Sequence, residues 1–183
     1  MAKIDVKHPV VKQEGVEKGF VLAKAIKVSA SPESNDAVLW ADGEAAESDK
    51  GFKQGSKIQI DGDDFSLANQ GKLLGHKVEG NKMIANGDDV APFFGFGFVG
   101  VKRVKGENVY VGKWYHKIQF GEPTDEFETK KESLEFGSST IEGGMYLDSN
   151  LDWKTEGEFK TEAEALAFVD ELAAIKTEAT PEP

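Results

Sequence analysis

The stretch DDVAPFFGFGF (88–98) is followed by KWYHKIQF (113–120), and these two runs decide the fold. Apolar residues recur at every second position in both runs, which is the period of a β-strand. The cluster KGEN (105–108) between them holds Gly and Asn, which accept the backbone angles of a tight turn. The sequence therefore predicts a long β-hairpin over about 93–120, with an aromatic face formed by Phe94, Phe96, Phe98, Tyr110, Trp114, Ile118 and Phe120.

The opposite face of this hairpin is bare on its first strand, because Gly95 and Gly97 alternate with the phenylalanines. The run GFGFVG (95–100) also matches the GxGxxG pattern of dinucleotide-binding sites, but that motif requires a helix directly after it. VKRV (101–104) continues a strand instead. The glycines therefore predict close packing of another sheet or subunit on this face rather than phosphate binding.

Composition excludes several classes of protein. The 183 residues are about the length of one domain, and the 12 phenylalanines can form a real core. The chain has no apolar run long enough to span a membrane and no apolar signal core near its N-terminus, so we expect neither membrane insertion nor export. It has no cysteine, which excludes disulfides and thiol catalysis and removes the commonest zinc ligands.

The charge balance is strongly acidic, with 33 acidic and 22 basic residues and a net charge of −11. Proteins that wrap nucleic acid need lysines and arginines to displace counterions from phosphate, and this chain has a single arginine, Arg103. The composition argues against DNA binding and also against use of the phenylalanines as a stacking platform for single strands. It suits a wall that repels DNA, or simply an acidic surface that keeps the protein soluble.

The rest of the chain predicts short strands and two helices. Residues 1–18 are expected to form an extended arm, and 19–175 a single domain with a long loop at 41–55 and a flexible tail at 176–183. Strands are expected at 19–29, 37–40, 57–61, 126–136, 140–147 and 153–159, with a small hairpin at 77–85 that turns at Gly80–Asn81. Asp64 and Gly75 are expected to cap a helix over 65–74.

The C-terminal helix, 161–175, has the clearest signature. Thr161 and Glu164 form a capping box. After them come apolar residues at helical spacing, Ala165, Leu166, Val169, Leu172 and Ala173. The fold class predicted from all these elements is mainly β with two short helices, arranged as a two-sheet antiparallel sandwich or partial barrel.

No motif points to catalysis, a metal or a cofactor, so none of the three is expected. The run DGDD (61–64) lacks the remaining ligands of a calcium loop, and turn and cap roles explain its aspartates. The three histidines, His8, His76 and His116, are far apart and in different contexts. A hydrolase that uses two carboxylates stays open as an alternative, because the sequence singles out no pair among its many acids.

Several runs together resemble one family in their order and spacing. These are LAKA (22–25), AAESD (45–49), LLGH (73–76), VAPF (90–93), the run 114–123, TKKESLEF (129–136) and TEAEA (161–165). They are similar to the major tail protein, or tail tube protein, of long-tailed non-contractile bacteriophages (siphophages). The resemblance covers roughly residues 4–175.

The resemblance implies a tail-tube sandwich with a flanking helix and no active site. It implies six-subunit rings that stack into a tube through which DNA passes unbound, a tape-measure protein, and tail terminator and distal tail proteins as partners. It also implies a place in the virion, after synthesis in the cytoplasm of a bacterial host. The alternatives are the inner tube of a contractile tail or secretion system and a free-standing acidic β-sandwich binding module.

Two sets of residues follow as candidate sites for this role. The set proposed for assembly is Phe94, Gly95, Phe96 and Gly97 of the aromatic hairpin, with Glu44, Glu47 and Asp49 of the loop. The set proposed to give the channel its negative charge is Glu126, Glu128, Glu132 and Glu135.

Overall fold

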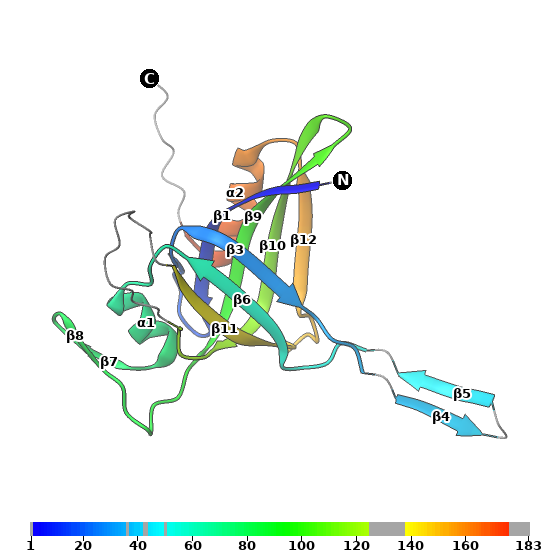
Figure 1. The fold of residues 1–183 in the computed structure, drawn as a ribbon, viewed down its shortest axis with the longest axis horizontal. Coiled ribbons are helices and arrows are strands. Elements are labelled where there is room, and N and C mark those ends of the chain that lie inside the picture. The colour runs from blue at the N-terminus through cyan, green and yellow to red at the C-terminus, as the bar shows by residue number, and fades with distance from the viewer. Residues whose placement is uncertain (1, 36, 42–43, 50, 125–137, 176–183) are drawn as a thin grey trace, which may run out of the picture.

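The computed structural model describes residues 2–35, 37–41, 44–49, 51–124 and 138–175. Twelve strands and two helices lie in this part of the chain (Figure 1). The strands are β1 (Ala2–Gln13), β2 (Phe20–Val21), β3 (Ala25–Ser31), β4 (Ala37–Ala41), β5 (Glu44–Asp49), β6 (Ser56–Gly62), β7 (Lys77–Glu79), β8 (Lys82–Ile84), β9 (Phe93–Val104), β10 (Glu107–Phe120), β11 (Ser139–Tyr146) and β12 (Lys154–Phe159). The helices are α1 (Leu67–Leu74) and α2 (Glu162–Ala173).

The aromatic hairpin predicted over 93–120 is formed by β9 and β10. Its two strands are antiparallel, and the chain reverses at Lys105 and Gly106, which both have positive φ. The register shifts between Tyr115 and Ile118, where β10 has one residue more than β9. This β-bulge reverses the alternation of β10 along its length, which a strict period of two does not anticipate.

The bulge corrects the predicted aromatic face. The core beside Phe94, Phe96 and Phe98 contains Tyr115, Ile118 and Phe120. Tyr110 and Trp114 belong to a second apolar cluster with α2 and Val169. The seven predicted residues are therefore divided between the two faces of the hairpin.

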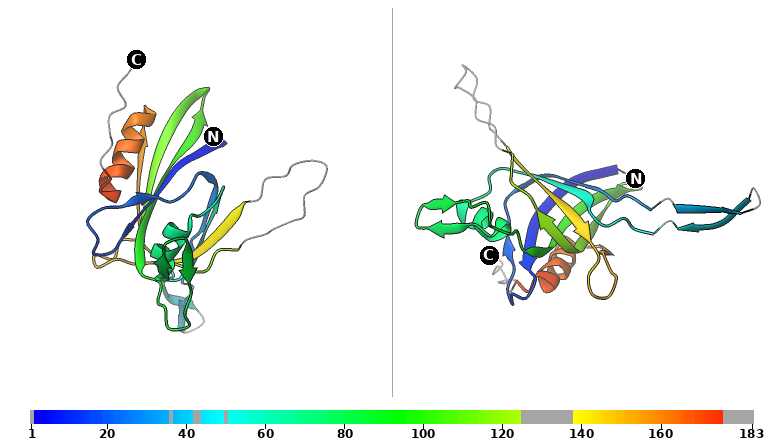
Figure 2. Two further views of the ribbon diagram at one scale, coloured as in Figure 1. Left: turned by 90° about the vertical axis from the view of Figure 1, so that its left-hand side faces the viewer. Right: turned by 90° about the horizontal axis from the view of Figure 1, so that it is seen from below.

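One strongly curled sheet forms the body of the molecule. Its strand order is β2-β1-β9-β10-β11-β6-β3. The strand β12 pairs with the first half of β10, at 110–115, and β11 pairs with the second half, at 117–120. The end of the sheet formed by β3, β6 and β11 bends across β1, β9 and β10 without pairing with β1, so the described strands make no closed barrel (Figures 1 and 2). The predicted class is confirmed: a mainly β, antiparallel, sandwich-like fold with two helices.

The curled sheet has a separate apolar cluster on each face. The inner cluster is the larger and includes Ile58, Ile60, Phe96 and Ile141, with Leu73 of α1 packed against it. The outer cluster lies under α2 and includes Val10, Val99 and Trp114 of the sheet, with Ala165 and Val169 of the helix. Burial of aliphatic side chains of this size contributes about 1.5–3 kcal/mol each, so α2 is an integral part of the fold.

The prediction of a separate N-terminal arm over 1–18 is wrong for residues 2–13, which form β1. The segment is extended, as expected, but it pairs with β9 along most of its length. Val10 and Val11 are fully buried, one in the outer cluster and one in the inner. The sequence of this segment does not identify its partner strand, because pairing in a sheet depends on residues elsewhere in the chain.

Three further boundaries differ from the prediction. The strand expected at 19–29 is divided into β2 and β3. Ser66 rather than Asp64 is the N-cap of α1, and its side chain accepts a hydrogen bond from the Asn69 amide. The expected loop at 41–55 contains β5, which pairs with β4 as a hairpin.

The other short elements are as predicted. Gly75 ends α1 in the left-handed conformation, β7 and β8 form the small hairpin, and Thr161 and Glu164 make both bonds of the capping box. The strand expected at 126–136 and the flexible tail expected at 176–183 both lie outside the described residues. In the described part of the chain, neither helix has the length and apolar character needed to cross a bilayer.

Candidate assembly interface

The hairpin of β4 and β5 projects from the body of the molecule (Figure 1). Its strands are antiparallel, with Ala37 opposite Asp49 and a register shift beyond Leu39. Three residues proposed for assembly, Glu44, Glu47 and Asp49, belong to β5. The two strands pair with each other as a separate sheet and do not join the curled sheet. A two-stranded hairpin is at best marginally stable alone, so this projection is a candidate for contact with a partner.

Two of the unpaired strand edges of the curled sheet belong to β3 and β1; β12, which pairs only with β10 in the described part of the chain, has a further one. β3 is the last strand of the sheet and pairs only with β6. On its outer edge, β1 pairs with β2 only at Val10 and Val11, so the edge of its first half is open. Unpaired edges present rows of amides and carbonyls to any other strand, and proteins usually protect them or use them for association.

These two edges form the walls of a groove of about 390 Å³. Residues 3–6 of β1 lie on one side and residues 25–28 with Ala30 of β3 on the other. The floor is formed by β9 and β10 and includes Phe98, Val101 and Tyr115. Burial raises the pKa of the Tyr115 phenol to about 12, and the nearby charge of Glu156 acts in the same direction. The Tyr115 phenol is therefore uncharged at neutral pH, whereas Lys102 and Lys113 of the same two strands also line the groove.

Charged side chains gather on the strands beside the groove. Lys102 of β9 lies 3.0 Å from Glu158, and Lys113 of β10 lies 3.3 Å from Glu156. Lys154 lies 3.1 Å from the same Glu156 oxygen. Burial alone would raise the pKa of Glu156, but the bond from Lys154 and the charge of Lys113 lower it overall. These ion pairs join β12 to β10 and β9, so the sheet beside the groove is held in place.

The four hairpin residues proposed for assembly lie inside the chain. Phe94 and Phe96 are in the inner core, almost without exposure. Gly95 and Gly97 face the outer cluster, where a Cβ atom would lie 2.3 Å and 2.6 Å from the ring of Trp114. The close approach predicted from these glycines is present, but the covering group is the chain's own tryptophan. A role for the four residues in subunit contacts stays a prediction.

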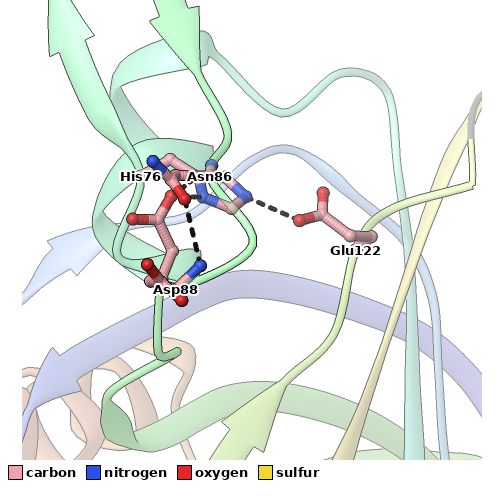
Figure 3. A network of polar contacts seen from close by, with 5 residues as sticks. His76, Asn86, Asp88 and Glu122 are labelled. Carbon is pink, nitrogen blue, oxygen red and sulfur yellow. Dashed lines mark hydrogen bonds and ion pairs between the residues drawn. The ribbon is translucent and has the colours of Figure 1, made fainter.

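His76 joins three segments near the end of α1 (Figure 3). It follows α1, and its ring nitrogens lie 2.7 Å from Asp89 and 2.6 Å from Glu122. The Asn86 amide donates to the same Asp89 oxygen. Both ring nitrogens can donate to carboxylates only when the imidazole carries two protons. Hydrogen bonds to Asp89 and then to Glu122 raise the pKa of His76, which favours this charged form.

The pKa of the Asp89 carboxyl is lowered, whereas that of His76 is raised. The hydrogen bond from the Asn86 amide, followed by that from His76, lowers its pKa. His76 therefore clamps three segments together: its own position after α1, the loop after β8 at Asp89, and the exit of β10 at Glu122. The sequence carries no signal for this clamp, because the three residues are far apart in the chain and match no motif.

The other two histidines also have polar partners. His8 lies 2.7 Å from the buried Asp170 of α2, and His116 lies 2.7 Å from the Thr155 hydroxyl and 3.3 Å from Asp148. Each of these contacts joins elements that are distant in the sequence. In the described segments no three His, Asp or Glu side chains are grouped in a way that would hold a metal ion. The GxGxxG run lies within β9 and precedes no helix.

The residues proposed to give the channel its charge, Glu126, Glu128, Glu132 and Glu135, lie outside the described residues. Their role stays a prediction. The groove between β1 and β3 was not predicted, since it depends on how the ends of one sheet meet. The exposed isoleucines on its rim were the available signal, but scattered surface apolar residues are common.

Comparison with known proteins gives little further information. No family model matches the chain, and no curated protein matches it. A chain in the cryo-EM structure of the anti-feeding prophage cap (AFP tube terminating cap) is similar at 10% identity and a TM-score of 0.46. That similarity covers 87% of this chain and 93% of the other. It defines neither a family nor an activity.

Proposed function

We propose that this protein is a structural subunit of a phage tail, the tail tube protein of a long-tailed, non-contractile phage. The feature that carries the proposal is the unpaired edges of β1 and β3 on the curled sheet, together with the hairpin of β4 and β5 that projects from it. A chain with these features is suited to join copies of itself edge to edge. The sequence resemblance to siphophage tail tube proteins over residues 4–175 supports the same role.

In this proposal six copies form a ring, and rings stack into a tube. The free edges of β1 and β3 are available for heterologous contacts, in which different surfaces of neighbouring copies meet and the ring closes by rotation. The fold supplies a rigid unit for such a ring, because α2 and the inner core hold both faces of the sheet. The protein acts through the shape and charge of the wall and has no catalytic role.

The charge of the chain suits a conduit for DNA. Six copies at −11 each carry a formal charge of −66. DNA carries one negative charge per about 1.7 Å of its axis, so a basic channel would bind it and slow its passage. Repulsion between an acidic wall and DNA extends only about 8 Å at physiological salt, so acids must line the channel itself. We propose Glu126, Glu128, Glu132 and Glu135 for this lining.

The test is sedimentation velocity of the purified protein over a range of concentrations, with and without residues 41–55. The intact chain is expected to form hexamers and larger stacks as its concentration rises. The shortened chain is expected to stay a folded monomer, with a circular dichroism spectrum that loses only the contribution of the β4–β5 hairpin. Normal assembly of the shortened chain would remove the hairpin from the proposal, and a strictly monomeric intact chain would contradict the function itself.

A further inference from the structure

The hairpin of β4 and β5 has a sequence that suits a protein partner better than water. β4 is the wholly apolar run AVLWA, whereas β5 is the acidic run EAAESD, with Glu44, Glu47 and Asp49. The hairpin nevertheless projects from the body, and its two strands form a sheet of their own (Figure 1). Apolar strands of this kind are stable when they add to a sheet or are covered.

The groove between β1 and β3 is open to a strand of this kind. Ile4 on its β1 side and Ile26 on its β3 side are 50% and 57% exposed, although both are large apolar side chains. Between them lies the floor of the groove, with the apolar rings of Phe98 and Tyr115. A strand that pairs with the free edge of β3 would cover Ile26 and place alternate side chains over this floor, which is the geometry of β-strand addition.

The charges of the two surfaces are complementary. Lys3 and Lys27 stand at the rim of the groove and are exposed, without an ion-pair partner among the described side chains. Lys102 and Lys113 also line it, although Glu158 and Glu156 already neutralise them. The one acid of the lining, Asp5, is paired with Lys7 at 3.6 Å. In a chain of net charge −11, this rim is locally basic, and β5 is locally acidic.

We propose that the hairpin of β4 and β5 from one copy docks in the groove between β1 and β3 of a second copy. In this contact the hairpin pairs with the free edge of β3, and the acids of β5 lie near Lys3 and Lys27. The contact is heterologous, since hairpin and groove are different surfaces, so each copy both donates and accepts. The inference rests on the proposed function in that it specifies how neighbouring copies of the tube join.

The chain has no cysteine, which permits a direct cross-linking test. One preparation carries Ala45→Cys in the hairpin, and a second carries Ile26→Cys in the groove. They are mixed under assembling conditions and treated with a short bis-maleimide, so that any product between the two variants joins two chains. Val90→Cys, at an exposed site outside the groove, replaces Ile26→Cys as the matched control. Thermal melts check that each variant is folded.

The expected result is a cross-linked dimer from Ala45→Cys with Ile26→Cys as the main product, and little product with Val90→Cys. A charge test follows the same logic: Lys27→Glu should weaken association up to roughly fivefold, as for one exposed ion pair. Glu47→Lys on the partner chain should restore it.

Three results would overturn the docking proposal. If Ala45→Cys cross-linked equally well to Ile26→Cys in the groove and to the control Val90→Cys, the products would arise from random collision. Cross-linking of Ile26→Cys to itself would show that two β3 edges meet in the assembly. Rings that form without any hairpin-to-groove product would leave the tail tube function in place and move the hairpin to another surface. Failure of the unmodified chain to assemble at all would instead contradict the proposed function.

Discussion

Replacement of Gly97 by alanine tests how tightly the outer face of the hairpin is packed. An added Cβ would lie 2.6 Å from the Trp114 ring, 2.8 Å from a Val169 methyl and 3.0 Å from the Lys113 carbonyl. The first two distances are shorter than carbon atoms tolerate, and Trp114 and Val169 are themselves buried. The substitution therefore forces α2 or Trp114 to move.

The cost of such overpacking is about 1–3 kcal/mol. This cost is partly offset, because alanine loses less backbone entropy on folding than glycine. The offset is about 0.4–1 kcal/mol. We expect Gly97→Ala to lower the free energy of unfolding by about 1–2 kcal/mol after this offset. For a domain of this length that corresponds to a fall in melting temperature of about 2–8 °C.

Gly100 provides the matched control in the same strand, β9. A Cβ at this position has no neighbour nearer than 3.8 Å, which is ordinary contact. Gly100→Ala should therefore be neutral or slightly stabilising. Urea denaturation of both variants, monitored by tryptophan fluorescence, measures the difference. If Gly97→Ala proved as stable as Gly100→Ala, the account of Trp114 and α2 as the cover of this face would be refuted.

Three further outcomes are expected. His76→Gln should flatten the pH dependence of the melting temperature above about pH 6.5. The pKa of His76 is raised in the folded protein by its contacts with Asp89 and Glu122. These contacts therefore stabilise the fold fully below the pKa that His76 has in the unfolded chain, and their contribution is lost as the pH rises through the pKa of the folded protein. Unchanged pH profiles would exclude a charged clamp. Leu73→Ala, in the inner core, should lower the free energy of unfolding by about 2–5 kcal/mol, and Leu172→Ala, which is only partly buried, should lower it by less; equal losses in denaturant melts would contradict the assigned burial. Reversal of Glu126, Glu128, Glu132 and Glu135 to lysine should leave tubes intact by microscopy and slow DNA release, whereas normal release would remove these residues from the channel.

The hairpin of β9 and β10 could be predicted from sequence because its signal is local and strong. The alternating phenylalanines and the turn at Lys105 and Gly106 depend on residues a few positions apart, and so does the capping box of α2. The division of the aromatic residues between two faces could not be predicted. It depends on the bulge between Tyr115 and Ile118, and one inserted residue exchanges the faces of the rest of the strand.

Features that depend on contacts between distant parts of the chain could not be predicted from the sequence either. The first strand was expected as an arm because its residues carry no strong pattern, yet its pairing with β9 buries Val10 and Val11. The His76 clamp and the groove between β1 and β3 both arise where separate elements meet. The acids of β5 were proposed for assembly as part of the long loop expected at 41–55, and the projecting hairpin gives them a location in the fold.

The central claim is that copies of this chain join into hollow rings. Cryo-electron microscopy of the concentrated protein, with end-on views averaged without imposed symmetry, tests this claim most directly. The account predicts rings or short tubes with six subunits around an open channel, and with a hairpin from each subunit in contact with its neighbour. Solid aggregates, or particles that remain single chains at every concentration, would contradict it.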